Sequence, residues 1–70
     1  MKAIYDPETD TLTLILRDEP ISESDELRDG IILDFGKDGR IVSLEVLDAF
    51  QHVAEPRSFA YEIKAAKTLS

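Results

Sequence analysis

The 70-residue chain contains no cysteine and only one histidine, His52. The absence of cysteine excludes disulfides, thiolate-ligated zinc and cysteine nucleophiles. One histidine cannot hold zinc without carboxylates or a second chain. Long hydrophobic runs are also absent: none approaches the roughly 20 residues that span a bilayer, and no apolar stretch near the N-terminus is typical of a secretory signal. We therefore expect a cytoplasmic protein with no membrane partner.

Basic residues are scarce, with eight Lys and Arg against fifteen Asp and Glu and a formal net charge of −7. The imbalance is local, because residues 1–29 contain nine acidic and three basic residues, whereas residues 49–70 contain two acidic and three basic ones. An acidic field repels a nucleic-acid duplex at long range, so we do not expect direct nucleic-acid binding. The same field would attract a basic protein.

The chain is too short for the large catalytic folds, such as a TIM barrel or a full dinucleotide-binding unit. Its composition, 43% hydrophobic and 33% charged, is typical of a globular protein. A chain of this size buries roughly 60% of its unfolded surface and is marginally stable. We expect one domain over residues 1–70, in which residues 64–70 could form a loose tail.

Alternating apolar residues predict an antiparallel sheet. Segments 2–5 and 11–16 form one predicted hairpin, and segments 31–35 and 40–48 form a second around the glycine-containing turn 36–39. Four such strands in sequence are expected to form a meander with one exposed and one buried face. The predicted buried face carries Leu12, Leu14, Leu16, Ile31, Leu33, Phe35, Val42, Leu44 and Val46.

The polar stretch 17–30 separates the two predicted hairpins. We expect it to cross irregularly or in extended form, with Ile21 and Leu27 turned inward. A helix over 22–28 is the alternative, because Ser22 and Asp25 have the spacing of a capping box.

The C-terminal third loses the simple alternation. Residues 49–55 have helical spacing and predict a short helix capped by Asp48. For residues 57–70, a strand at 58–63 is favoured over a helix because aromatic and aliphatic residues alternate there. The expected fold class is therefore α+β, a small antiparallel β-meander sheet of four to five strands with one short helix near residues 48–55.

Two acidic groups have the spacing of hard-cation ligands. Asp6, Glu8 and Asp10 alternate in the first loop, but a calcium loop also needs a glycine and a later bidentate acid, which this loop lacks. A solvated loop whose Asp side chains bond backbone amides is the favoured interpretation. The turn that begins at Asp34 weakly resembles a calcium loop with Glu45 at its twelfth position, yet a strand follows where a helix is needed.

A third acidic group combines neighbouring predicted strands. Asp34 and Glu45 should share the exposed face of the sheet, with Asp48 nearby. Paired carboxylates can act as general acid and base when burial raises one pKa. The expected state is a solvated sheet face. The weak metal candidates are thus Asp6, Asp10, Asp34 and Glu45.

No catalytic set can be assembled from the sequence. The serines have no nucleophile-elbow context, and the three glycines form no phosphate loop. His52 has no neighbour that would make it a general base, and a surface helix histidine is the favoured interpretation. We expect no cofactor, and a non-catalytic role is favoured over an enzyme.

Four short motifs follow one another in order: Tyr-Asp-x-x-x-Asp at 5–10, Asp-Gly-Ile-Ile-Leu-Asp at 29–34, Asp-Gly-Arg at 38–40 and Leu-Glu-Val-Leu-Asp-Ala at 44–49. In this order, and with an acidic linker between the first two, they resemble domain-of-unknown-function family 2283, a group of short prokaryotic proteins, over about residues 2–50. Ser43 stands where the family commonly has glycine, and Gly36 replaces an acid, which weakens a metal site.

The resemblance implies a small meander sheet with a short helix and no settled activity. It also suggests an antitoxin-type role. The first hypothesis is therefore an interaction module that covers a basic, toxin-like protein, and the second is a homo-oligomer. A carboxylate-based divalent-metal binder is the third. The expected interaction residues are Ile15, Ile32 and Ile41 on the exposed faces, with the acidic Glu23, Asp25 and Glu26.

Overall fold

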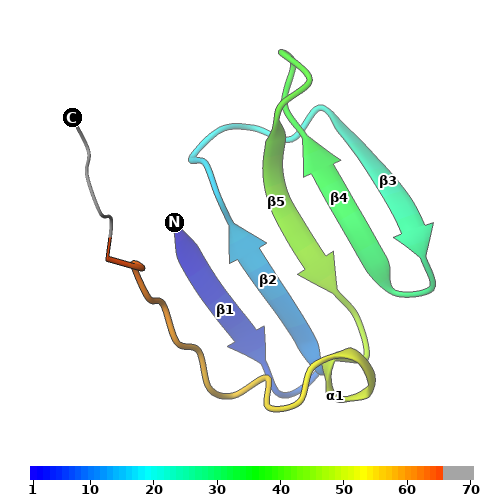
Figure 1. The fold of residues 1–70 in the computed structure, drawn as a ribbon. Helices are drawn as coiled ribbons and strands as arrows, with labels where there is room; N and C mark the ends of the chain where they lie inside the picture. The colour runs from blue at the N-terminus through cyan, green and yellow to red at the C-terminus, as the bar shows by residue number, and fades with distance from the viewer. Residues whose placement is uncertain (66–70) are drawn as a thin grey trace.

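The computed structural model describes residues 1–65, which form one five-stranded antiparallel sheet and a single turn of helix (Figure 1). The elements are β1 (Lys2–Asp6), β2 (Thr11–Ile15), β3 (Glu23–Arg28), β4 (Ile31–Phe35), β5 (Ile41–Val46) and α1 (Ala49–His52). An antiparallel sheet with one short helix is thus confirmed.

The strand order is β1-β2-β5-β4-β3, so the expected sequential meander is wrong in its order. After β2 the chain crosses the end of the sheet, forms the outer strand β3, and returns through β4 to place β5 in the centre (Figure 1). The physical reason is polarity. β5 is rich in apolar residues and gains a neighbour on each side, whereas the charged strand β3 takes the edge, where charged side chains stay in water.

The strand β3 confirms the extended form expected for part of segment 17–30 and excludes the alternative helix over 22–28, but the inward position expected for Ile21 and Leu27 is wrong. The six residues of β3 are all exposed, and it pairs with β4 from Glu23 opposite Phe35 to Arg28 opposite Ile31. A register shift between Glu26 and Arg28 leaves Leu27 between paired positions, 61% exposed. Ile21 is 52% exposed, so neither apolar residue turns inward. The backbone N–H and C=O groups along the outer edge of β4 need hydrogen-bond partners. This requirement outweighs the polar composition of the segment that forms β3.

The register divides the sheet into two faces of different character. Directly opposed residues share a face, as Leu12 does with Val46 and Leu14 with Leu44. The leucine face carries Ala3, Tyr5, Leu12, Leu14, Ile31, Leu33, Leu44 and Val46. The carboxylate face carries Ile15, Ser24, Ile32, Asp34, Ser43 and Glu45.

A register shift interrupts this division in β5. Asp34 is opposite Ser43, but the next residue, Phe35, is opposite Ile41, so Val42 has no partner in the register. Such a bulge ends strict alternation. Ile41, expected on the same face as Ser43, therefore lies opposite a residue from the other set.

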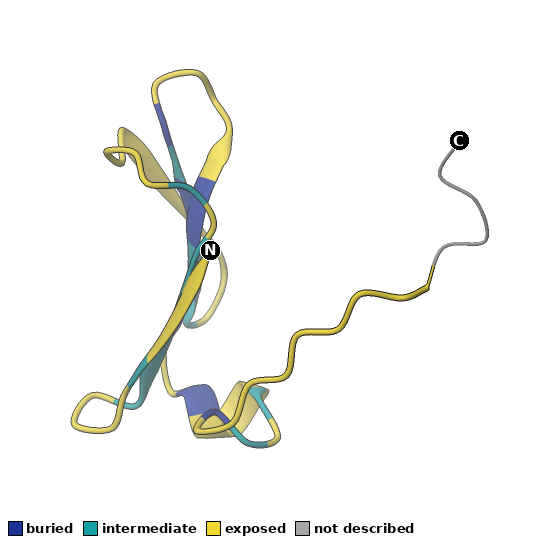
Figure 2. Ribbon diagram, turned by 90° about the vertical axis from the view of Figure 1, so that its left-hand side faces the viewer, coloured by how far each residue is buried: buried dark blue, intermediate teal, exposed yellow. Residues whose placement is uncertain are grey.

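The core is small. Among the described residues, the buried hydrophobic side chains are Val42, Val46 and Ala49. Figure 2 shows the sheet edge-on as a single layer, with α1 and the segment after it on one side, near one end of the sheet. Most of the leucine face is consequently only half-buried.

The helix α1 is shorter than the expected 49–55 segment, because Val53 already has an extended backbone. Asp48 precedes the helix in the left-handed region, with φ of 50°, and its side chain makes no capping hydrogen bond. The expected cap is therefore wrong. Asp10 takes this place from the β1–β2 loop: its main-chain oxygen accepts a hydrogen bond from the Ala49 amide at 2.8 Å. Its carboxylate oxygens accept from the Phe50 amide, both at 3.3 Å.

The expected strand at 58–63 is absent from the chain as described. Residues 58–65 have no regular secondary structure and are exposed throughout. Part of the predicted loose tail, residues 66–70, lies outside the described residues. Within residues 1–65, no helix is long and apolar enough to cross a membrane.

Candidate functional site

The most enclosed polar group in the described chain is a carboxylate pair on the carboxylate face. Asp34, in the middle of β4, is only 1% exposed. The register brings Ser24 of β3 and Ser43 of β5 opposite it, one on each side. Both hydroxyls donate to Asp34 at 2.6 Å, Ser24 to Oδ1 and Ser43 to Oδ2. Glu45 of β5 lies diagonally opposite Asp34, and a hydrogen bond between the two carboxyls affects the pKa values of both.

This environment separates the pKa values of the two carboxyls. Burial of Asp34 acts to raise its pKa, but hydrogen bonds from Glu45, Ser24 and Ser43 outweigh burial and lower it below the usual value. For Glu45, the hydrogen bond with Asp34, followed by burial and the repulsion of the Asp34 charge, raises the pKa to about 6. Below a pH of about 6 the pair therefore holds one proton, carried by Glu45 beside an ionised Asp34.

The Asp34–Glu45 pair differs from the solvated face expected from the sequence. Each Asp34 oxygen is already occupied by a serine hydroxyl, and no buried side-chain polar atom in the described chain lacks a partner. Neither carboxyl lines any of the four described hollows. The shifted pKa values of the pair show that the two carboxyls share a site that binds and releases a proton.

The first acidic group, in the β1–β2 loop, is held by local hydrogen bonds. Asp6 accepts from the amide of Glu8 at 3.0 Å. Asp10 is in the left-handed region with φ of 53°, accepts from the Tyr5 hydroxyl at 2.8 Å, and caps α1. Burial and this hydrogen bond raise the pKa of Tyr5. Tyr5 also packs edge-on against Phe50, with ring centroids 6.1 Å apart. Asp10 thus joins the hairpin to α1.

The second acidic group forms a tight turn between β4 and β5. Asp38 accepts from the Arg40 amide at 3.0 Å, and Gly39 has φ of 82°. That backbone bond is the main cause that lowers the pKa of Asp38. Among the described residues, no group of three or more His, Cys, Asp or Glu side chains could hold a metal ion. The four metal candidates Asp6, Asp10, Asp34 and Glu45 therefore do not assemble.

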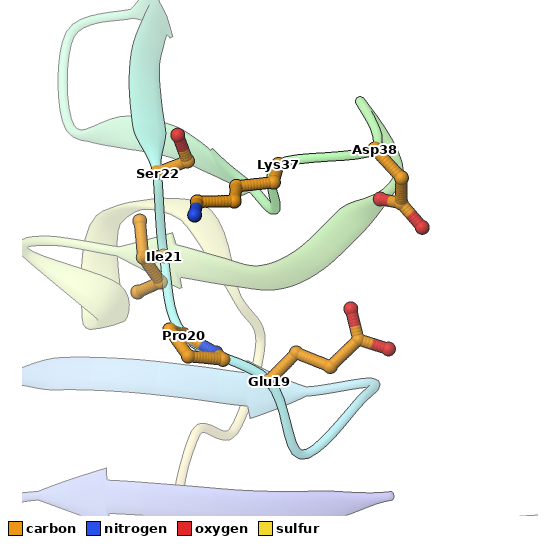
Figure 3. Close-up of a pocket in the computed structure, with 6 residues that line it drawn as sticks. All are labelled: Glu19, Pro20, Ile21, Ser22, Lys37 and Asp38. Atoms are coloured by element: carbon orange, nitrogen blue, oxygen red, sulfur yellow. The ribbon is translucent and has the colours of Figure 1, made fainter.

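A hollow of about 440 Å³ lies where the β2–β3 crossover meets the β4–β5 turn (Figure 3). Its lining residues are Glu19, Pro20, Ile21, Ser22, Lys37 and Asp38. The Arg17 guanidinium lies 2.5 Å from a Glu19 oxygen and 3.7 Å from an Asp38 oxygen, so both carboxylates are already ion-paired. The hollow is a seam between two loops and contains no nucleophile with an adjacent base.

A second hollow, of about 340 Å³, opens on the leucine face beside β1. Ala3, Tyr5, Leu12 and Leu14 line it from the sheet, and Val53, Pro56, Arg57, Ser58 and Phe59 line it from the segment after α1. The hollow could not be predicted from the sequence, because its two walls are about 40 residues apart in the chain. The alternation of the leucines was the available signal, since it marked an apolar face that so short a chain cannot cover.

The expected interaction residues are spread over the sheet. Glu23, Asp25 and Glu26 are exposed on the edge strand β3, and Glu26 accepts a hydrogen bond from the Gly30 amide at 3.0 Å. Ile15 and Ile32 are half-buried on the carboxylate face, and Ile41 is 38% exposed beside the bulge. His52 is exposed at the end of α1.

Comparison with known proteins supports the resemblance that the motifs suggested. Neither the curated proteins nor the solved structures contain a match to the chain. A protein-family model, described as a protein of unknown function (DUF2283), matches residues 2–49, from β1 to the first residue of α1. This match covers more than half of the sequence, and the chain therefore belongs to the DUF2283 family.

Proposed function

We propose that the protein is a non-catalytic interaction module that binds another protein on its leucine face. The observation that carries this proposal is the single-layer sheet, whose apolar face is covered only near one end by α1 and the segment after it (Figure 2). Apolar side chains half-exposed on a continuous face lose water when a partner packs on them, and that loss favours binding.

The exposed area supports the proposal. The chain exposes 5788 Å², whereas a compact monomer of its mass would expose roughly 4,400 Å². The extended segment after α1 contributes to the difference. The excess of about 1,400 Å² includes the exposed arm at 58–65, so only a part of it belongs to the leucine face that a partner would cover.

The charge at the rim of the leucine face defines the partner. Glu23 and Asp25 of β3 lie opposite Phe35 and Leu33, so their carboxylates border the apolar face on one side. A fitting partner presents apolar residues flanked by lysine or arginine. An acidic module with a net charge of −7 would bind such a basic protein rapidly and in a salt-sensitive manner. An antitoxin-like role is the form of this function in which the basic partner is toxic.

Charge reversal tests the proposal. We would capture partners from the native host at low salt with the wild-type chain, Asp25→Lys and the control Glu8→Lys, whose side chain is in the distant β1–β2 loop. Each captured basic protein would then be purified and titrated against all three chains. We expect Asp25→Lys to weaken binding at least about tenfold and Glu8→Lys to leave it near the wild-type value. Equal binding by the two variants, or no basic partner at low salt, would contradict the proposal.

Self-association is the second candidate function, favoured by the same excess of exposed surface. Ile15 and Ile32 lie on the carboxylate face, half-buried in the single chain, and a two-fold contact there would bury both from each copy. Light scattering of Ile32→Glu against the wild-type chain tests this contact. A strict monomer for the wild-type chain at high concentration would exclude it.

A further inference from the structure

The two outer strands of the sheet differ in how they are protected. Four of the six residues of β3 are charged, and charged side chains along an edge oppose pairing with another strand. The other edge strand, β1, has charge only at its ends, Lys2 and Asp6, with Ala3, Ile4 and Tyr5 between them. Since β2 is the one strand that pairs with β1 in the described part of the chain, the outer backbone groups of β1 are open there to a further strand.

The C-terminal arm, residues 58–65, has the pattern of a strand without a partner. Phe59, Tyr61 and Ile63 alternate along it and are 57%, 68% and 80% exposed. Within the described chain, the arm's backbone hydrogen bond is the one from the Ser58 amide to the Glu55 oxygen, at its start. An alternating apolar segment of this kind is typical of a strand with one buried face.

The base of the arm is anchored. Pro56 is buried, and the Arg57 guanidinium lies 5.6 Å from the centroid of the Phe50 ring. Together with the turn between Glu55 and Ser58, these contacts direct the arm away from the sheet (Figure 2). The arm runs antiparallel to β1 of its own chain but is directed away from the sheet (Figures 1 and 2), so a second copy can meet it where it stands.

We propose that the C-terminal arm of one copy adds to β1 of a second copy as an antiparallel sixth strand. Exchange about a two-fold axis would let each copy donate its arm and accept the other, so both β1 edges would be closed. This inference goes beyond the proposed function, because it concerns the β1 edge and not the leucine face.

One register satisfies both chains. With Phe59 opposite Tyr5, the aromatic side chains form a cross-strand pair on the leucine face, a favourable arrangement in antiparallel sheets. The same register sets Glu62 opposite Lys2, which pairs opposite charges on the other face. It extends the leucine face by one strand, and the exposed apolar side chains of the arm become part of that face.

The absence of cysteine makes a cross-linking test free of background. In this register Ala60 is opposite Ile4, and directly opposed strand residues are close enough for a disulfide. Separate Ile4→Cys and Ala60→Cys chains would be mixed and oxidised. We expect a disulfide between the two different chains at the mass of two copies. The matched control mixes Ala60→Cys with Asp25→Cys on the charged β3 edge, where we expect little cross-linking.

A second variant measures the strand pairing without a new bond. Tyr61→Pro removes an amide donor that faces β1 in this register, opposite Ala3, and that makes no hydrogen bond within the described chain, so the fold of residues 1–56 should be unaffected. We expect light scattering to give about twice the mass of 7.9 kDa for the wild-type chain. Dissociation should become at least about tenfold easier for Tyr61→Pro than for the matched control Tyr61→Ala.

Several results would overturn the inference. A wild-type chain that is monomeric at all concentrations would do so, as would association of Tyr61→Pro as strong as that of Tyr61→Ala. Preferential cross-linking to Asp25→Cys would place the arm on the wrong edge. A disulfide that forms only inside an Ile4→Cys/Ala60→Cys double variant, and not in the mixture, would show that the arm folds onto its own β1. The Asp25→Lys test of the proposed function leaves the arm and β1 intact, so the two can fail separately.

Discussion

The raised pKa of Glu45 predicts how the stability of the fold depends on pH. The pKa of Glu45 in the folded chain is about 6, above the ordinary 4.5. The folded chain therefore holds this proton more tightly than the unfolded chain does. The stabilising contribution of the proton is complete below pH 4.5 and is lost as the pH rises through 6. For Asp34 the sign is opposite, because its lowered pKa stabilises the fold above pH 3.8 and this contribution is lost on acidification. The fold should therefore be most stable between pH 3.8 and pH 4.5, where the contributions of Asp34 and Glu45 are both present.

The magnitude follows from the same two values. A change of pKa from 4.5 to about 6 corresponds to about 2 kcal/mol, at roughly 1.4 kcal/mol per pH unit. Glu45→Gln should abolish the loss of stability as the pH rises, because the amide donates a hydrogen bond to Asp34 at every pH, as the protonated carboxyl does at low pH. We therefore expect Glu45→Gln to be more stable than the wild-type chain at pH 7 by about 2 kcal/mol, which is roughly 10 °C in Tm for a domain of this size.

Urea unfolding followed by circular dichroism at pH 4.5, 5.5, 6.5 and 7.5 measures the effect. All chains should be compared at one protein concentration, because association would add to the apparent stability. Glu23→Gln is the matched control, since it makes the same change in net charge at an exposed position on β3. The reasoning is refuted if Glu45→Gln loses stability between pH 4.5 and 6.5 as the wild-type chain does, or if Glu23→Gln produces the same gain.

Three further substitutions should destabilise the fold, each by a different cause. Asp34→Ala leaves two serine hydroxyls and a glutamic acid without their acceptor and should cost about 2–4 kcal/mol in urea unfolding at pH 5. Asp10→Ala removes the link between Tyr5 and α1 and strains a position with positive φ, so it should lower Tm by several degrees, whereas Asp10→Asn should retain most of the stability. Gly30→Ala should cost about 1–3 kcal/mol, because Gly30 has φ of 81° and a Cβ there would lie 3.1 Å from the Leu47 oxygen. Wild-type stability in any of them would contradict the corresponding contact.

The alternation of apolar residues was sufficient to identify four of the strands and their faces. Leucines two residues apart in 12–14 and the matching Leu44 and Val46 required one apolar face, and the register places Leu14 opposite Leu44, whereas the bulge at Val42 interrupts the expected alternation. The turn 36–39 was equally clear, since glycine and aspartate there meet the needs of a tight reversal. These features are local, so a few neighbouring residues carry the information.

The order of the strands was not local and could not be predicted in the same way. The segment that became β3 has no apolar alternation, and it forms a strand because β4 provides a row of backbone partners. The arm at 58–65 shows the converse: its alternation is that of a strand, but no neighbour among residues 1–65 pairs with it. In both segments, therefore, the presence or absence of a neighbouring strand decided whether a strand formed, whatever the local sequence pattern.

The candidate site likewise combines features that the sequence could predict with features that depend on distant strands. Sequence alone could place Asp34 and Glu45 on one face, because both positions follow from the alternation of neighbouring strands. It could not show that Asp34 would be buried between Ser24 and Ser43, since Ser24 belongs to a strand that sequence did not predict.

By itself, then, the sequence determined a short acidic chain of the DUF2283 family, an antiparallel sheet with an apolar face, and the lack of any chemistry that needs cysteine. The tertiary structure decided that β5 is central, that Asp10 caps α1, and that the pKa of Glu45 is raised beside Asp34. The reason is physical: alternation and turns are set by adjacent residues, whereas burial and pKa values depend on which distant strands become neighbours.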